Sequence, residues 1–487
     1  MFDISKSLFQ IGNKNANGSE AILTKDAVAE LLGTTPEALA AFEASYQANV
    51  LDAEVDTGSL FDLSAKQAAA MLPREDLIET ARKLNDRIIV ELLEQTPVMT
   101  YDGTSLTIGK VPIPTSEEAS LTVPVTLTEV QRVPESIRPQ LTGSLMKKDI
   151  GEGSSSVLLA TYKNWLEAKD PEKKQMSYHM FRRGLDILDL DPITYEMLSM
   201  NPNSMGYWLP PLIDGIQKQR FFKVPKTKVI KVPLTLLQLS RMEYSDLTPG
   251  TMDILDRFCY RAFELDETKS YFIKTGTYSS KFDFRNAKVT GAKEVRELGE
   301  YLLFIQNQAV IMAGYLTTPS IYGVSTTNEW VVREFIENVD NCPCIYKGLP
   351  LHAEYRVFVD FDEDTVLGMN PYWDPNVMKQ RFGHKEDADS PHQVHDYITY
   401  KMYEDTLMRL YRDNSRWVKT YVEEMVPHIN LPGQWSIDIM QNGDDFWVID
   451  MATAETSALS DCVPKGLLKH APENWLPKLP APGVAWV

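Results

Sequence analysis

The chain has 487 residues, of which 43% are hydrophobic and 10% aromatic, so it is long and apolar enough for two or three folded domains and is not a disordered protein. Its formal net charge of −19 disfavours a broad nucleic-acid interface, which normally draws on clustered lysine and arginine. No window approaches 18 uninterrupted apolar residues, the N-terminus lacks a signal-peptide pattern, and the four cysteines are too few for a disulfide framework. We therefore expect a cytoplasmic protein with no membrane partner.

The first 155 residues are expected to form a mixed helical and extended N-terminal region of unknown role. Helices are predicted over residues 25–32, 36–46 and 74–95, and short strands or an extended arm over 96–143. The Gly- and Ser-rich run at 151–156 predicts a flexible junction, and we expect a helical connector over 156–220.

From about residue 221, strands alternate with helices, the pattern of an α/β or α+β domain. We expect one subdomain over residues 221–329 and a second subdomain with a tail over 330–487. Strands are predicted at 226–233, 270–274, 331–336, 354–361 and 366–370, and helices at 249–265, 292–307 and 395–426.

Two carboxylates near the C-terminus are typical of a metal site. Asp438 and Asp450 end two short apolar segments that flank a reversing turn at residues 441–445. Because side chains alternate along a strand, both can project from one face of a hairpin. Mg²⁺ prefers oxygen ligands and usually shares them with substrate phosphates, so this pair matters most beside a phosphate cradle.

A polar loop upstream fits such a cradle. Lys274 ends an apolar strand, and the loop that follows carries Gly276, Ser279, Ser280 and Lys281. Backbone N–H groups at glycine and serine can approach an anion closely, and a lysine adds charge to the same oxygens. The loop does not match the P-loop pattern, and any strand can end in Lys-Thr-Gly.

Two further strands carry charges. Arg333 and Glu334 lie in an otherwise apolar segment, which an exposed edge strand would also explain. Glu354 and Arg356 share one face of another strand. A surface ion pair is the alternative reading of the second pair.

Taken in order, these motifs resemble the ATP-grasp superfamily, whose two α+β subdomains clamp ATP between antiparallel sheets. The similarity is closest to the eukaryotic cell-division-cycle family of ATP-grasp chaperones that assist assembly of translation initiation factor two. Prokaryotic and phage ATP-grasp clades with an Arg-Glu-Phe segment are similar as well. The resemblance covers residues 221–465 and implies an α+β, ATP-grasp fold.

The resemblance also implies roles for these residues, with ATP and Mg²⁺ as cofactors. Lys274 would meet the α- and β-phosphates, with Lys281 and the Ser279-Ser280 loop closing over them, and Arg356 would face the γ-phosphate. The hinge would bind adenine through main-chain groups, Glu354 would accept the ribose hydroxyls, and the two aspartates would hold Mg²⁺. The hinge residues are Arg333, Glu334, Phe335 and Ile336.

One position departs from the family pattern. Many ATP-grasp enzymes place an asparagine two residues after the last metal carboxylate, where this chain has Ala452. Thr453 or Glu455 could replace that ligand, the site could hold a single metal, or the domain could bind nucleotide with little turnover.

Three functional hypotheses follow. The first is a ligase that activates a carboxylate as an acyl phosphate for attack by an amine or another nucleophile. The second is an ATP-binding assembly protein that clamps a protein partner with little turnover. The third is an acidic structural protein with a vestigial nucleotide fold.

Other candidate sites have simpler explanations. Cys342 and Cys344 alone do not make a tetrahedral zinc site. His384, His392 and His395 could belong to a lid, but a solvated loop also explains them. The acidic run from Asp360 to Asp364 is more simply a hairpin turn than a calcium site.

Overall fold

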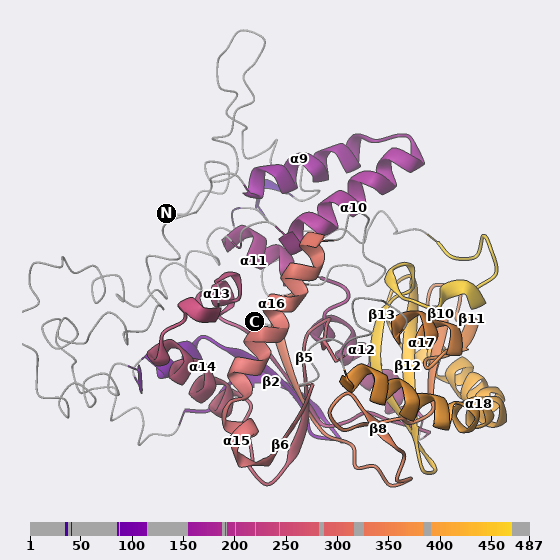
Figure 1. Ribbon diagram of the computed structural model, residues 1–487. Helices are drawn as coiled ribbons and strands as arrows, with labels where there is room; N and C mark the ends of the chain where they lie inside the picture. Colours follow the sequence, from indigo (N-terminus) through magenta and orange to yellow (C-terminus); the bar gives the residue numbers. More distant parts are fainter. Residues whose placement is uncertain are drawn as a thin grey trace, which may run out of the picture.

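The computed structural model contains two β-sheets with helices packed around them (Figure 1). The residues that it describes are 35–37, 40, 85–86, 88–113, 154–187, 190, 192–199, 201–219, 221–242, 244–281, 287–315, 326–382 and 391–469. The helix predicted over 25–32 lies outside them, as does most of the helix predicted over 36–46. Of the helix predicted over 74–95, residues 85–86 and 88–94 are described and helical.

The first sheet has six strands in the order β2-β1-β4-β7-β5-β6, with every neighbouring pair antiparallel. Its strands are β1 (Pro97–Tyr101), β2 (Leu106–Lys110), β4 (Thr227–Lys231), β5 (Ser270–Thr275), β6 (Lys288–Thr290) and β7 (Glu329–Glu334). Because side chains alternate along a strand, Ile230, Ile273 and Trp330 face one side, where they pack with helices α14 (Pro249–Ala262) and α16 (Leu298–Tyr315). Val229 and Val331 face the other side and join a second core.

The second sheet has five strands in the order β11-β10-β12-β13-β3. They are β3 (Phe222–Lys223), β10 (Glu354–Asp360), β11 (Thr365–Pro371), β12 (Gln434–Asn442) and β13 (Asp445–Thr453). Only the β13–β3 pair of this sheet is parallel. Its apolar face packs against α12 (Met205–Ile216) and the C-terminal half of α18 (Pro391–Met425). This second core also contains apolar side chains from one face of the first sheet.

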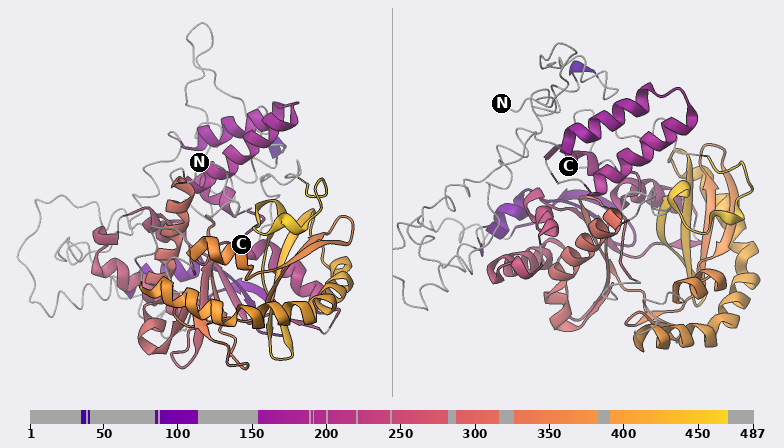
Figure 2. Two further views of the ribbon diagram at one scale, coloured as in Figure 1. Left: turned by 45° about the vertical axis from the view of Figure 1, so that its right-hand side comes forward. Right: turned by 45° about the horizontal axis from the view of Figure 1, so that its top comes forward.

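The remaining helices cover the ends of the two sheets. The long helices α9 and α10 lie side by side above the first sheet, at the top of Figure 1 and again in Figure 2. The helix α17 packs on α18 beside a small β8–β9 pair. These elements are α9 (Ser154–Glu167), α10 (Pro171–Ile187), α11 (Pro192–Leu198), α13 (Leu234–Gln238), α15 (Gly291–Arg296), α17 (Pro375–Phe382), β8 (Cys344–Ile345) and β9 (Leu349–Pro350).

The predicted α+β class with antiparallel sheets is confirmed. Each strand predicted after residue 221 is present, although β7 ends at Glu334 and leaves Phe335 and Ile336 outside it. The predicted helix over 292–307 is two helices, α15 and α16, and the second extends to Tyr315. Among the described residues, no helix combines the length and apolarity needed to span a membrane.

The predicted domain boundaries do not coincide with the sheets. Strands β1 and β2 come from the region 1–155, yet β1 pairs with β4. Strand β7 begins at Glu329 and crosses the predicted boundary between 329 and 330, and it pairs with both β4 and β5. Local patterns do not reveal these pairings because they join residues more than 50 positions apart.

Candidate functional site

A cavity of about 230 Å³ lies where the two sheets meet. This volume is many times the roughly 10 to 15 Å³ that one water centre needs, so the cavity can hold a ligand of many atoms. Twelve of the residues predicted for the site line it: Lys274, Ser279, Ser280, Lys281, Arg333, Glu334, Phe335, Ile336, Glu354, Arg356, Asp438 and Asp450. Segments nearly 180 residues apart in sequence therefore share one cavity.

Three charged residues form a row across the second sheet. Arg356 on β10 stands opposite Asp438 on β12, which stands opposite Asp450 on β13. A register shift lies between Asp438 and Ile439. Residues directly opposite on antiparallel strands share a face, so the predicted placement of the two aspartates on one hairpin face agrees with the register.

Arg356 and Asp438 form a buried, bidentate ion pair. Nε and Nη2 of Arg356 each donate to one carboxylate oxygen of Asp438 at 2.7 Å. The Arg356 guanidinium also lies over the ring of Tyr372, 4.9 Å from its centroid. Parallel donation from a planar guanidinium fixes the orientation of the carboxylate and strengthens the ion pair.

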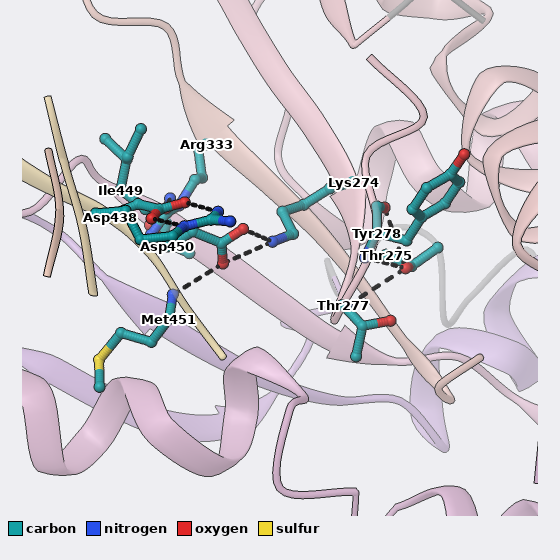
Figure 3. Close-up of polar contacts among 11 residues, drawn as sticks. Lys274, Thr275, Thr277, Tyr278, Arg333, Asp438, Ile449, Asp450 and Met451 are labelled. Atoms are coloured by element: carbon teal, nitrogen blue, oxygen red, sulfur yellow. Dashed lines mark hydrogen bonds and ion pairs between the residues drawn. The ribbon is translucent and has the colours of Figure 1, made fainter. Parts of the chain in front are cut away.

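Lys274 connects the first sheet to this row. Its Nζ donates to both oxygens of Asp450, at 2.8 and 2.7 Å (Figure 3). The lysine side chain is only 3% exposed, whereas that of Asp450 is 39% exposed. Burial lowers the pKa of Lys274, and Asp450 partly opposes that shift. The two sheets thus contribute opposite charges to one end of the cavity.

Arg333 lies beside this pair and is held from two sides. Its Nε donates to Oγ1 of Thr227 at 3.1 Å, and its Nη1 donates to the carbonyl oxygen of Ile449 (Figure 3). Its Nη2 is buried and has no hydrogen-bond partner among the described residues. Burial lowers the pKa of Arg333 to about 10, with Asp450 opposing the shift, so the guanidinium stays charged at neutral pH. The alternative of an exposed edge strand is wrong for Arg333, because β7 is flanked by β4 and β5.

Glu354 also lines the cavity with an unpartnered atom. Its side chain is buried, and Oε2 accepts no hydrogen bond from the described residues. Burial raises the pKa of Glu354 from 4.5 to about 7, with Asp438 adding to the shift and Lys281 and Arg356 opposing it. A surface ion pair with Arg356 is therefore the wrong explanation for this residue, since Arg356 pairs with Asp438 instead.

This raised pKa predicts a pH dependence of stability. A carboxyl that holds its proton more tightly when folded contributes stability that is fully present below pH 4.5 and lost as pH rises through about 7. The loss amounts to about 3 kcal/mol at most. Glu354→Gln cannot ionise, so its free energy of unfolding should fall less between pH 5 and pH 8 than that of the wild type in denaturant titrations.

The control for this comparison is Glu337→Gln, which changes an exposed carboxylate on the segment after β7. It should leave the pH dependence of the wild type intact. Identical slopes for the wild type and Glu354→Gln would contradict the raised pKa of this buried carboxyl.

Lys281 lies against two aromatic rings. Its Nζ is 4.5 Å from the ring centroid of Tyr372 and 5.6 Å from that of Trp373. Both aromatic residues follow β11 and line the cavity. Stacking against π-faces holds the charge of the lysine at the cavity wall. Asp283, which follows in the same loop, lies outside the described residues.

The segment after β7 offers fewer main-chain donors than the sequence predicts. The N–H of Glu334 donates to the carbonyl oxygen of Lys226, and the N–H of Phe335 donates to that of Ser270. The Glu334 carboxylate bridges Lys226 and Lys269. Among Glu334, Phe335 and Ile336, only Ile336 makes no main-chain N–H donation to a described residue, which leaves its N–H for a ligand.

The loop after Lys274 is stabilised from within. The hydroxyl oxygen of Thr275 accepts from the N–H of Tyr278 at 3.0 Å and from that of Thr277 at 3.4 Å (Figure 3). Gly276 lies outside the cavity lining: a Cβ there would come within 2.8 Å of Oε2 of Glu329. Close packing against Glu329, rather than contact with a ligand, explains the glycine.

Ala452 brings no polar side chain to the site. It lines the cavity opposite Ser436. The suggested replacements, Thr453 and Glu455, do not line the cavity. The hydroxyl of Thr453 forms a hydrogen bond with that of Thr456, and a carboxylate oxygen of Glu455 lies 3.6 Å from Nε2 of His179. Neither of those two positions therefore brings an oxygen ligand to the cavity, whereas Thr456 and Ser457 of the same segment do line it.

Sequence analysis missed several residues of the lining. Asn203, just before α12, lines the cavity while its Oδ1 accepts from the N–H of Thr453 at 2.8 Å. His352, Tyr372 and Trp373 also line the cavity and were not predicted. A Tyr-Trp pair directly after a predicted site strand was the one available signal.

The other candidates are resolved more simply. Asp360 pairs with Lys469 at 2.8 Å, and Asp362 accepts from the N–H of Gly433, which accounts for two carboxylates of the acidic turn. His384 and the side chain of His392 lie outside the described residues, and His395 is exposed on α18.

Comparisons with known proteins give limited matches. No known protein family and no curated protein matches the chain. Among solved structures, a C-terminally truncated Cdc123 from Schizosaccharomyces pombe is similar at 16% identity over 53% of this chain and 85% of that chain, with a TM-score of 0.29. A second structure of Cdc123 from Schizosaccharomyces pombe is similar at 17% identity over the same shares, with a TM-score of 0.28. Scores below 0.5 do not establish a shared fold.

Proposed function

We propose that the cavity between the two sheets is an ATP-grasp-type site that binds ATP together with Mg²⁺. The observation that carries this proposal is a pair of buried atoms without hydrogen-bond partners among the described residues, Nη2 of Arg333 and Oε2 of Glu354. An unsatisfied buried polar group costs about 1 to 3 kcal/mol. ATP supplies both missing partners, since its phosphate oxygens accept from a guanidinium and its ribose hydroxyls donate to a carboxylate.

The carboxylates of Asp438 and Asp450 fit a magnesium ion that shares its ligands with phosphate. Without nucleotide, these carboxylates pair with Arg356 and Lys274. On binding, the two cations would turn to the phosphates while the carboxylates hold the metal. Mg²⁺ would neutralise phosphate charge, and each ionic group of the site would keep an opposite partner.

Apolar residues of the cavity lining suit adenine. Phe335, Ile336 and Met312 are among them, and the N–H of Ile336 would donate to a ring nitrogen. Glu354, with its unpartnered Oε2, is the acceptor proposed for the ribose hydroxyls.

We further propose that ATP binding serves to hold a protein partner during assembly, with little turnover. Ala452 supports this reading, because a methyl group replaces an amide at the position where many ATP-grasp enzymes carry a metal-site asparagine. A site with fewer metal ligands stabilises transferred phosphate charge less well. We therefore expect ADP release to be slow and to respond to a protein partner.

ATP-dependent ligation of a carboxylate to an amine is the second candidate. It is favoured by the exposure of Asp450, whose side chain is 39% exposed, so the phosphate end of the cavity is open to an acceptor. Release of ADP that depends on a small carboxylate, with no protein present, would support ligation over clamping.

The binding proposal is tested by calorimetric titration of the purified chain with ATP. With Mg²⁺ present we expect one site, and with EDTA a loss of affinity of about tenfold or more, because the phosphates then meet two unneutralised carboxylates. ADP should bind more weakly than ATP. A folded chain that binds no ATP, or binds it equally in EDTA, would contradict the proposal.

A further inference from the structure

The segment between β7 and β10 brings three metal-ligating side chains together, away from the row of Arg356 and the two aspartates. Asp340, Cys342 and His352 each offer one ligand atom, and these atoms lie within 4.8 Å of one another. Sγ of Cys342 is 3.7 Å from Nδ1 of His352. Sequence reasoning rejected a site here because it considered only Cys342 and Cys344 and did not foresee that the chain folds His352 back onto Cys342.

Hydrogen bonds hold this segment in place. Asn338 binds both main-chain groups of Cys342, accepting from its N–H at 3.0 Å and donating to its carbonyl oxygen at 2.9 Å. Asn442, at the end of β12, accepts from the N–H of Val339 and donates to the carbonyl oxygen of Glu337. The three ligand positions therefore do not depend on an unsupported loop.

Two of the candidate ligands also have an outer partner. Oδ2 of Asp340 accepts from the N–H of Gly443 at 2.6 Å. The hydroxyl of Tyr403 donates to Sγ of Cys342 at 3.6 Å. Outer partners of this kind orient metal ligands and tune their affinity. His352 is buried, with its carbonyl oxygen held by Nε1 of Trp373 at 3.0 Å.

We propose that Asp340, Cys342 and His352 bind one Zn²⁺ ion, with a water as the fourth ligand. Thiolate, imidazole and carboxylate are the ligand types of tetrahedral zinc, at about 2.0 to 2.3 Å from the metal. Those bond lengths place sulfur and nitrogen about 3.6 Å apart across a tetrahedral angle, close to the 3.7 Å between Sγ and Nδ1. The side chain of Asp340 is exposed, so it can rotate to bring a carboxylate oxygen to the zinc ion.

Binding of Zn²⁺ releases one proton, from Cys342. The Cys342 thiol loses its proton to solvent as the zinc–sulfur bond forms, and the neutral imidazole binds through Nδ1. That bond leaves the proton of His352 on Nε2, an atom with no hydrogen-bond partner among the described residues. Because His352 also lines the cavity, the ion would fix the tautomer of a residue in the cavity wall.

Metal titration of the full chain tests the proposal, and it does not depend on nucleotide. After EDTA treatment and removal of the chelator, the chain is titrated with Zn²⁺ against a chromophoric competitor, with Mg²⁺ in large excess to occupy the hard carboxylates of the cavity. We expect one tightly bound Zn²⁺ per chain. Titration with Co²⁺ should add a thiolate-to-metal charge-transfer band.

Two cysteine variants provide the comparison. Cys342→Ser should lose the tight equivalent and the Co²⁺ band. Cys344→Ser is the matched control, since Cys344 is exposed and lies outside the cluster, and it should keep both. Asp340→Asn, which changes an exposed residue, should lower Zn²⁺ affinity by about tenfold or more and tests the site in case Cys342→Ser fails to fold. A folded wild type without tight Zn²⁺, or binding unaffected in both Cys342→Ser and Asp340→Asn, would overturn the proposal.

Discussion

Lys274→Met should weaken the binding of Mg²⁺-ATP by about 10- to 100-fold, because it removes charge-assisted hydrogen bonds worth about 1.5 to 3 kcal/mol. The lysine is buried at the end of β5, and its Nζ donates only to Asp450 among the contacts described above. Methionine keeps most of the buried stem, so the loss reports the charge rather than a cavity. Calorimetry under identical Mg²⁺ concentration measures the change.

The matched control is Lys269→Met, which removes the same charge just before the other end of β5. Lys269 is 45% exposed and pairs with Glu334 at 3.1 Å. The ATP affinity of Lys269→Met should stay within about twofold of that of the wild type, because exposed ion pairs contribute little free energy. Equal affinities for Lys274→Met and the wild type would remove this lysine from the phosphate site.

Arg356→Met should lower the free energy of unfolding by about 3 to 5 kcal/mol, the usual cost of breaking a buried ion pair from one side. The side chains of Arg356 and Asp438 are 12% and 9% exposed, so the remaining carboxylate would be buried without its bidentate partner. Denaturant titration of the chain without nucleotide measures the loss.

Two variants show whether this loss comes from the orphaned charge. Arg356→Met/Asp438→Asn should recover much of the stability, since no uncompensated ion remains. Lys223→Met breaks an exposed pair on the same sheet, Lys223 with Asp445 at 2.7 Å and side-chain exposures of 50% and 47%, and should cost less than about 1 kcal/mol. Equal losses for Arg356→Met and Lys223→Met would contradict the buried pairing.

The elements that sequence predicts well are those with a strong local pattern. The alternation of apolar residues around Lys274 and in the strand of Glu354 and Arg356 predicts β5 and β10, and the turn before Asp445 predicts the β12–β13 hairpin. Twelve of the thirteen site residues that the motifs and the family resemblance imply line one cavity. Gly276 is the exception, because its tight packing against Glu329 depends on a strand 50 residues away.

Partners across strands could not be predicted in the same way. That Arg356 pairs with Asp438, and Lys274 with Asp450, depends on the register between distant strands and on the packing of the two sheets. The hydrogen bond from the N–H of Phe335 to the carbonyl oxygen of Ser270 likewise depends on how distant strands pair. Asn203 and His352 reach their positions through loops whose paths no periodicity describes.

The central claim is that Asp438 and Asp450 hold Mg²⁺ with ATP in the cavity between the sheets. The most direct measurement is calorimetric titration of Asp438→Asn/Asp450→Asn and the wild type with ATP at saturating Mg²⁺, after circular dichroism has shown that both are folded. We expect a single ATP site in the wild type and a loss of affinity of about 100-fold or more in the double variant, since both metal carboxylates are gone. Equal, Mg²⁺-dependent affinity in the two chains would contradict the claim.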